Sequence, residues 1–380
     1  MRIALLGNHP DGLQMAKALV DTGRHELTAF CGPSISSGSA ELKPNRTSGD
    51  MEEILADPGI DAVIVAGNSD QRSLQLRRAL QSEHHVLCVY PPDQKPDIAY
   101  EAAMIQADTR RVLLPILLGS MHPAIKRLQV LVQSVQSANW LILWEQQVGR
   151  GSEANDRSKG TTLAPYFPGW EVLQALGGPI AEVSAFAERS ERLMEEPLLV
   201  AGRFEKGGLF QASLIPSARP RWRLQVTATA FHAELDFPNG FSGPALLAWH
   251  NETGTCNREA WPAQNLFIEM VKVFEDASQR NDAAASPQGL VTWQDAIRCA
   301  ELDDAARRSV ERRRASTLEY PEATEEASFK GTMTLIGCGM LWIMLVLLIL
   351  SRWYPALLAV IVLMLTLFLS LQLLRLIIKK

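Results

Sequence analysis

The first turn of the sequence contains residues that could bind a phosphate group. Gly7, His9 and Gly12 follow an apolar run of strand length, Ile3–Leu6, and apolar residues then recur at helical spacing. A buried strand that turns sharply into a helix presents the positive end of that helix to an anion, as in dinucleotide-binding domains. The spacing here is G-x-H-x-x-G, so an imidazole stands where a middle glycine would let backbone approach phosphate. The alternative, a turn that only connects strand and helix, stays open.

The neighbours of this turn predict weak binding. Pro10 pushes His9 towards extended backbone, and Asp11 places a negative charge beside the anion site. The next predicted strand, residues 26–31, ends at Gly32, where dinucleotide-binding domains carry an acidic residue that holds the ribose hydroxyls. We therefore expect the strand–turn–helix unit to form and its affinity for a dinucleotide to be weak or lost.

The elements that would position this site alternate between strands and helices. Further buried strands are predicted at Asp61–Ala66, His85–Val89 and Val112–Leu117, with helices at Gln71–Gln81 and Ile98–Asp108. This alternation predicts an α/β fold with a doubly wound parallel sheet, a Rossmann-like arrangement. We assign residues 1–118 to this domain.

The second half of the chain is rich in short β-type runs. They are predicted at Trp140–Gln147, Ile180–Glu188, Gly208–Ser213, Trp222–Ala230 and Phe231–Phe237. Several of them alternate apolar and polar residues, so one face of the sheet should be buried and the other exposed. Two amphipathic helices follow, at Gln264–Asp276 and Trp293–Arg313. Residues 119–314 are therefore predicted to form a second, α+β domain.

Charge and cysteine content exclude several classes of function. The net charge is -5 and no lysine- or arginine-rich face stands out, so we expect no nucleic-acid partner. The five cysteines are scattered and include no C-x-x-C pair. This pattern predicts reduced thiols, without a disulfide framework and without a bound metal.

The C-terminal part of the chain differs sharply in composition. Residues 315–330 form a polar, Glu-rich linker, and two apolar segments follow, 331–350 and 355–375. Each has the length that a helix needs to cross a bilayer, so two transmembrane helices are predicted and membrane lipid is a predicted partner. The alternative is a buried helical pair in a globular domain, although no other stretch could cover two helices that are apolar all round.

Positive charge predicts the orientation of this hairpin. Arg312–Arg314 and Lys330 precede the first segment, and Arg375, Lys379 and Lys380 follow the second. The tight turn between the segments, Ser351–Tyr354, contains only Arg352 as a cation. Cytoplasmic flanks carry the excess of Lys and Arg, so the folded domains and both chain ends are expected on the cytoplasmic side of the cytoplasmic membrane.

Three stretches carry a resemblance to a known family. They are DAVIVAGNSDQRSLQLRRALQSEHHVLCVYPP (61–92), Met121–Ala124 and Val291–Arg308. Together they resemble the glucose–fructose oxidoreductase / inositol dehydrogenase (Gfo/Idh/MocA) family over about residues 1–315. The resemblance implies a Rossmann-like domain that binds NAD or NADP, followed by an open, mostly antiparallel sheet. It also implies hydride transfer to or from a small sugar, and cofactor contacts at Gly7, His9, Gly12, Gly32, Gly67 and Asn68.

The same resemblance implies a catalytic lysine, aspartate and histidine, and this sequence departs from all three. Tyr90 stands at the position of the lysine, Ala164 at that of the aspartate and Pro168 at that of the histidine. Proton transfer requires a group with a near-neutral pKa within hydrogen-bond reach of the reacting hydroxyl. Tyr90 is the best candidate for a replacement acid. His122, Tyr166 and Glu171 are titratable groups nearby, although such residues are more often packed or solvated.

Two classes of function therefore stay open. The first is an NAD(P)-dependent oxidoreductase with a degenerate active site, in which Tyr90 replaces the lysine. The second is a non-catalytic module that binds a sugar or nucleotide, or acts as a scaffold, at the membrane. In a third, weaker alternative the hairpin mainly assembles a homo-oligomer.

Overall fold

The computed structural model describes residues 1–32, 42–134, 139–149, 166–188, 196–217, 219–238, 241, 243–250, 255–280, 291–312, 316–317 and 347. All but the last belong to one compact unit, Met1–Leu318, and the second unit is Glu319–Lys380. The predicted linker 315–330 and both predicted membrane spans, 331–350 and 355–375, lie almost entirely outside the described residues. Among the residues that are described, no helix is both long and apolar enough to cross a bilayer.

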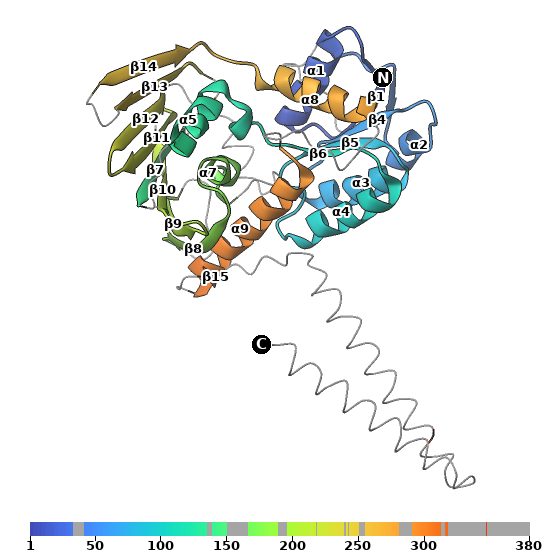
Figure 1. Cartoon of the computed structure of the whole chain (residues 1–380). Helices are drawn as coiled ribbons and strands as arrows, with labels where there is room; N and C mark the ends of the chain where they lie inside the picture. The colour runs from blue at the N-terminus through green and yellow to red at the C-terminus, as the bar shows by residue number, and fades with distance from the viewer. Residues whose placement is uncertain are drawn as a thin grey trace. The chain divides into compact units, whose positions relative to one another are not determined.

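The first sheet contains six parallel strands in the order β3-β2-β1-β4-β5-β6 (Figure 1). The strands are β1 (Arg2–Leu6), β2 (Glu26–Cys31), β3 (Arg46–Ser48), β4 (Ala62–Val65), β5 (His85–Val89) and β6 (Leu113–Ile116). The connecting helices are α1 (Pro10–Asp21), α2 (Met51–Leu55), α3 (Ser69–Gln81) and α4 (Asp97–Thr109). The predicted doubly wound sheet is confirmed, and its strand order reverses between β1 and β4, where such folds bind ligands.

Alternate side chains of the buried strands face two different layers of helices. Ile3 and Leu5 lie in a core cluster with α1 and α8 (Leu266–Arg280), whereas Ala4 and Leu6 lie in a cluster with α3 and α4. This is the period of two that a strand buried on both faces requires. Figure 1 shows α8 packed next to α1, although the two helices are far apart in the sequence.

The second sheet contains nine strands in the order β14-β13-β12-β11-β7-β10-β9-β8-β15. They are β7 (Trp140–Gly149), β8 (Ile180–Ala187), β9 (Leu198–Phe204), β10 (Leu209–Ser217), β11 (Arg221–Ala228), β12 (Phe231–Phe237), β13 (Ala245–His250), β14 (Cys256–Trp261) and β15 (Ser316–Thr317). All neighbouring pairs are antiparallel except β7 and β10, so the sheet is mixed. Helices α5 (Pro123–Ser134) and α7 (Trp170–Gly177) pack on one face.

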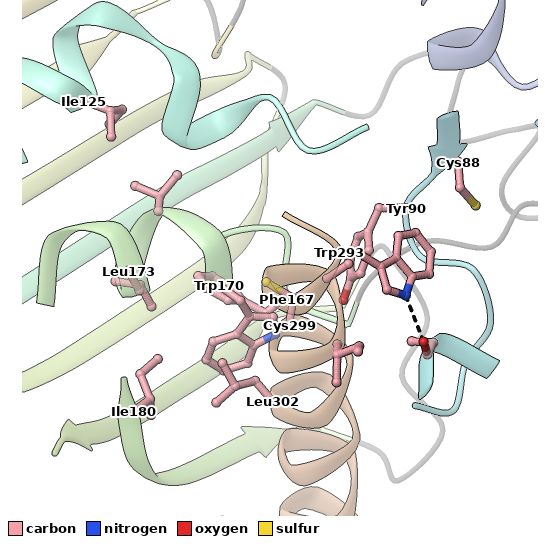
Figure 2. Close-up of a cluster of buried hydrophobic side chains, with 14 of the residues drawn as sticks. Cys88, Tyr90, Ile125, Phe167, Trp170, Leu173, Ile180, Trp293, Cys299 and Leu302 are labelled. Carbon is pink, nitrogen blue, oxygen red and sulfur yellow. Dashed lines mark hydrogen bonds between the residues drawn. The ribbon is translucent and has the colours of Figure 1, made fainter. Parts of the chain in front are cut away.

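Helix α9 (Trp293–Arg312) joins the two sheets. It contacts α4 and β6 of the first sheet and α7 and β8 of the second. At its start, Trp293 Nε1 donates to the Ala99 carbonyl of α4 at 2.8 Å (Figure 2). Near its end, Ser309 Oγ accepts from the Ala185 N–H of β8 at 3.0 Å. Because α9 contributes buried side chains to the packing of both sheets, this helix holds the carboxyl edge of the first sheet against the second domain.

Candidate dinucleotide and active site

The glycines predicted to line the cofactor site meet at the carboxyl edge of the first sheet. Gly7 follows β1 with φ +100°, and its N–H donates to the Cys31 carbonyl at 2.7 Å. A methyl group on Gly7 would lie 2.2 Å from the Ala66 carbonyl oxygen, and one on Gly32 would lie 3.3 Å from Gly7 Cα. Only glycine fits this turn at Gly7, because both its φ angle and its contact with backbone exclude a side chain.

Gly12 allows α1 to pack directly on the end of β4. A methyl group at this position would lie 2.2 Å from Ala66 Cβ, so helix and strand could not keep their present separation. Gly12 therefore has the role that the last glycine of the dinucleotide pattern has in helix–strand packing.

His9 occupies the position where a phosphate would bind. It is the N-cap residue of α1, and its Nδ1 atom accepts a hydrogen bond from the Asp11 N–H at 3.2 Å. Its backbone N–H donates to the Ala66 carbonyl at 3.0 Å, and Pro10 has no N–H at all. Among the described residues, the first backbone N–H of α1 that these bonds leave for another acceptor is therefore that of Gly12. The imidazole therefore satisfies part of the helix terminus that an anion would otherwise satisfy.

Gly67 and Asn68 form the loop between β4 and α3. Gly67 is buried under the Gln75 side chain, whereas Asn68 is exposed and begins α3 without a capping bond from its side chain. These two residues and the glycines above border the same edge of the sheet. The structure therefore brings together all six predicted cofactor positions, Gly7, His9, Gly12, Gly32, Gly67 and Asn68.

A residue that the sequence reasoning missed, Arg72, lies directly beneath this edge. Its side chain is fully buried, and its guanidinium donates to the carbonyls of Gly67 (3.0 Å) and Pro91 (2.7 Å). These carbonyls belong to the loops after β4 and β5, so one side chain fixes both loops. A signal was present in the sequence, because Arg72 precedes Leu76 and Leu80 at the spacing of the buried helix face.

Tyr90 directly follows β5, and its side chain is buried. The side chain is buried in a core cluster with residues of α7 and α9, which Figure 2 shows together with Trp293 and Cys299. Within the described residues, its hydroxyl has no hydrogen-bond partner. Burial, and then the negative charges of Asp303, Cys299 and Glu171, raise the pKa of Tyr90 well above its ordinary value. Tyr90 is therefore protonated at neutral pH.

Two buried carboxyl groups, those of Glu171 and Asp303, contribute to the raised pKa of Tyr90. Glu171 of α7 accepts from the Gly119 N–H at 2.6 Å, and burial raises the pKa of its carboxyl to about 8. Asp303 of α9 accepts from the N–H groups of Tyr166 (2.9 Å) and Phe167 (3.0 Å) and from the Trp170 indole, while burial raises its pKa to about 6. Both carboxyl groups can thus hold and release a proton near neutral pH, and Glu171 is the one that stays mostly protonated at pH 7.

The other predicted active-site positions are placed as follows. Pro168 is exposed on the turn before α7, and Ala164 lies outside the described residues. His122 is fully buried against Phe237 and Phe241, and burial lowers its pKa to about 4. The imidazole of His122 is therefore a neutral packing group, and it accepts a hydrogen bond from the Ala124 N–H at 3.1 Å.

No protein-family profile and no curated protein matches the sequence. Solved structures with a similar fold include the 3-ketoreductase KijD10 from Actinomadura kijaniata with NADP and TDP-benzene. It has a TM-score of 0.68 and 13% identity, over 82% of this chain and 98% of that one. GenD2 from gentamicin A biosynthesis, in complex with NAD, has a TM-score of 0.67 and 18% identity, over 84% and 96% of the two chains.

An oxidoreductase from Agrobacterium radiobacter, in complex with NAD+, L-tartaric acid and magnesium, is similar with a TM-score of 0.66. Its identity is 12%, over 83% of this chain and 98% of that one. Two of these neighbours are a 3-ketoreductase and an oxidoreductase, and all three structures contain NAD or NADP. At such identities the likeness concerns the fold and leaves the chemistry to the residues of this chain. The described unit thus has the two-sheet fold of Gfo/Idh/MocA-type oxidoreductases.

Proposed function

We propose that this chain is a membrane-anchored protein that binds a nicotinamide dinucleotide weakly and lacks the proton-transfer groups of a sugar dehydrogenase. The observation that carries the proposal is Tyr90, which directly follows β5 as a buried, protonated phenol. The residue that follows the same strand in the resembling family is a catalytic lysine. A phenol that stays protonated at neutral pH cannot accept the proton of a substrate hydroxyl there.

The cofactor proposal is supported by the neighbours and by the edge of the first sheet. Similar structures were crystallised with NAD or NADP, and Gly7 and Gly12 preserve the turn that such cofactors use. The residues fit the group only in part, because the His9 imidazole caps α1 and Gly32 offers no ribose acceptor. We therefore propose weak affinity. When bound, the nicotinamide would supply hydride chemistry. This chain would hold the cofactor in position but would not provide a group for proton transfer.

The ligand proposal is a small sugar. Neighbours of this fold were crystallised with TDP-benzene and with L-tartaric acid, both rich in oxygen acceptors. In this chain such a ligand would lie against the loops that follow β4 and β5.

A second candidate, an active oxidoreductase, is favoured by one observation. Glu171 is buried, its Oε2 atom has no hydrogen-bond partner within the described residues, and burial raises its pKa to about 8. A carboxyl that is protonated at neutral pH can act as a general acid. In this alternative Glu171, and not Tyr90, would manage the proton.

The two candidates are separated by binding and turnover measurements on the full chain in detergent. Calorimetry with NAD and NADP should give dissociation constants above about 100 μM. A panel of polyols, inositols and amino sugars should give no NAD(P)-dependent oxidation. Turnover that disappears in Glu171→Gln but persists in Tyr90→Phe would establish the enzyme and reject the binding module, because general acid–base help is worth roughly 10²–10⁴-fold.

The membrane part of the proposal rests on the apolar segments 331–350 and 355–375 and on the positive residues that flank them. We propose that the folded domains and both termini face the cytoplasm, with Ser351–Tyr354 on the other side. Cysteines placed at Ser351 and at Lys379 test this in intact cells with an impermeant thiol reagent. Labelling at Ser351 alone is expected. Labelling at Lys379 alone would reverse the orientation, and extraction of the full chain by salt would remove the membrane assignment.

A further inference from the structure

Arg72 is a buried cation that forms no ion pair with any residue that the structure describes. The side chain has no exposed surface, and its Nε and Nη1 atoms donate to the neutral carbonyls of Gly67 and Pro91. The third nitrogen, Nη2, is also buried and has no hydrogen-bond partner among the described residues. Within that part of the chain Arg72 takes part in no ion pair. A guanidinium keeps its charge in proteins, so this position holds an uncompensated positive charge.

The position of Arg72 on its helix adds to this imbalance. It lies in the first turn and a half of α3, at the positive end of the helix dipole, where a cation is disfavoured. Burial accordingly lowers the pKa of Arg72, and the charges that oppose this effect are those of Cys88 and Asp11. The two hydrogen bonds to loop carbonyls use the donor capacity of Arg72, but they leave its charge without a counter-ion in the buried position.

An anion at the carboxyl edge of the sheet would balance this charge. A methyl group on Gly7 would lie 2.4 Å from the Gly67 nitrogen, and the Gly67 carbonyl accepts from Arg72, so Gly67 connects the guanidinium to the glycine turn. The N-termini of α1 and α3 both point to this edge, and both are positive. The His9 imidazole accepts from the Asp11 N–H, so this donor of α1 is not available to an anion. The positive potential at this edge remains.

We propose that Arg72 is the fixed positive charge of the cofactor site and favours the diphosphate of a bound dinucleotide. The inference rests on the proposed function and deepens it. Arg72 has two roles in this proposal. It positions the loops after β4 and β5 through its hydrogen bonds, and its charge attracts the diphosphate. The charge of Arg72 thereby supplies part of the attraction for phosphate that the G-x-H-x-x-G turn does not provide.

The test compares charged and uncharged ligand fragments on the full chain in detergent. Wild type, Arg72→Gln, Arg72→Lys and Arg78→Gln are titrated with ADP-ribose, adenosine and inorganic pyrophosphate. Arg78→Gln is the matched control, because Arg78 lies on the same helix but is half-exposed and pairs with Glu52 at 3.3 Å. Circular dichroism and thermal unfolding report whether each variant folds.

Arg72→Gln should bind ADP-ribose about tenfold more weakly, the equivalent of roughly 1.4 kcal/mol, and adenosine as well as wild type does. Arg72→Lys retains the charge and should stay within about threefold of wild type for ADP-ribose, and Arg78→Gln should be unchanged. If Arg72→Gln fails to fold, Arg72→Lys decides the question. A tenfold loss for ADP-ribose in that variant would reject the electrostatic role.

Two outcomes separate this inference from the proposed function. Equal losses for ADP-ribose and adenosine in Arg72→Gln would show that Arg72 only holds the loops, and would leave dinucleotide binding intact. If wild type binds no ADP-ribose but is stabilised by pyrophosphate, and Arg72→Gln is not, the cofactor proposal fails while the anion site stands. If neither ligand distinguishes wild type from Arg72→Gln, the inference is wrong.

Discussion

At the scale of single residues, burial decides what Tyr90 can do. The sequence places the phenol of Tyr90 directly after β5, and its residue type alone permits a role as an acid. In the folded chain the ring packs in the core, and the hydroxyl has no partner among the described residues. A buried polar group without a hydrogen bond destabilises the fold, so the ring of Tyr90 contributes to packing while its hydroxyl carries a cost.

Tyr90→Phe should therefore leave the protein as stable as wild type or more stable by up to about 1 kcal/mol. The phenyl ring keeps the packing and removes only the unsatisfied hydroxyl. Tyr90→Lys is the contrasting variant and should be strongly destabilised, because it buries an ammonium group in the same core. Thermal unfolding of the three proteins checks both statements. A lower midpoint for Tyr90→Phe than for wild type would mean that the hydroxyl has a stabilising partner.

Glu171 should make stability depend on pH. Its pKa is raised from 4.5 to about 8 in the folded chain, so the folded state binds a proton that the unfolded state has released. Stability from this group is present below pH 4.5 and is lost as pH rises through 8. Between pH 6.5 and 8.5 the loss should amount to about 2 kcal/mol at most.

The check is thermal unfolding of wild type and Glu171→Gln across this range. The glutamine retains an oxygen for the Gly119 N–H but carries no proton that ionises, so the curve of Glu171→Gln should be flatter by a few degrees. Asp303 does not interfere, because its pKa of about 6 lies below the range. Parallel curves for the two proteins would contradict the raised pKa.

Part of the site could be predicted from residue types. Gly7 and Gly12 have the turn and packing roles that their spacing predicts, and the departure at His9 is visible in the sequence. Arg72 was missed because a charged residue on a helix is normally a solvated one. The proton-holding capacity of Glu171 was missed because it arises from burial, which depends on α7, Gly119 and α9 together.

At the scale of elements, the residues at the start of α1 affect both the stability of that helix and the affinity for the cofactor. His9→Gly would remove the capping imidazole and release the Asp11 N–H, so affinity for NAD should increase while helix stability falls by a few tenths of a kcal/mol. Calorimetry and thermal unfolding measure the two effects. Gly12→Ala is the control in the opposite direction.

The methyl group of Gly12→Ala would lie 2.2 Å from Ala66 Cβ and force α1 away from β4. We expect a loss of about 1–3 kcal/mol in stability and no gain in affinity. If His9→Gly binds NAD no better than wild type, the imidazole does not limit the approach of phosphate, and the acidic side chain of Asp11 becomes the main obstacle.

Sequence patterns predicted the buried elements best. β2, β5 and β12 have the predicted bounds, since each is a short apolar or alternating run with turn residues beside it. β14 was missed because its residues, CNREAW, are mostly polar and form an exposed edge. β13 was missed because Leu246 is apolar on the exposed face and breaks the alternation. The parallel pairing of β7 with β10 depends on distant contacts, which no local pattern encodes.

At the scale of the whole molecule, the compact unit Met1–Leu318 buries its own core. A chain that ends near Tyr320 should therefore be folded and monodisperse without detergent, whereas the full chain should require detergent for extraction. Gel filtration of the truncated protein and carbonate or salt washing of membranes provide the measurements. Aggregation of the truncated protein, together with release of the full chain by salt, would mean that residues 331–375 belong to the core.

The packing of α8 against α1 has a consequence for biosynthesis. Phe267, Met270 and Phe274 cover the face of the first sheet on which Leu13 and Leu19 also lie, yet they are translated after almost the entire second sheet. A nascent chain that has just completed β6 still lacks this cover, so its first sheet leaves the ribosome with apolar surface exposed. The protein should therefore depend on chaperones until α8 has been synthesised, and premature termination anywhere between β6 and α8 should yield a substrate for proteolysis rather than a free dinucleotide-binding domain.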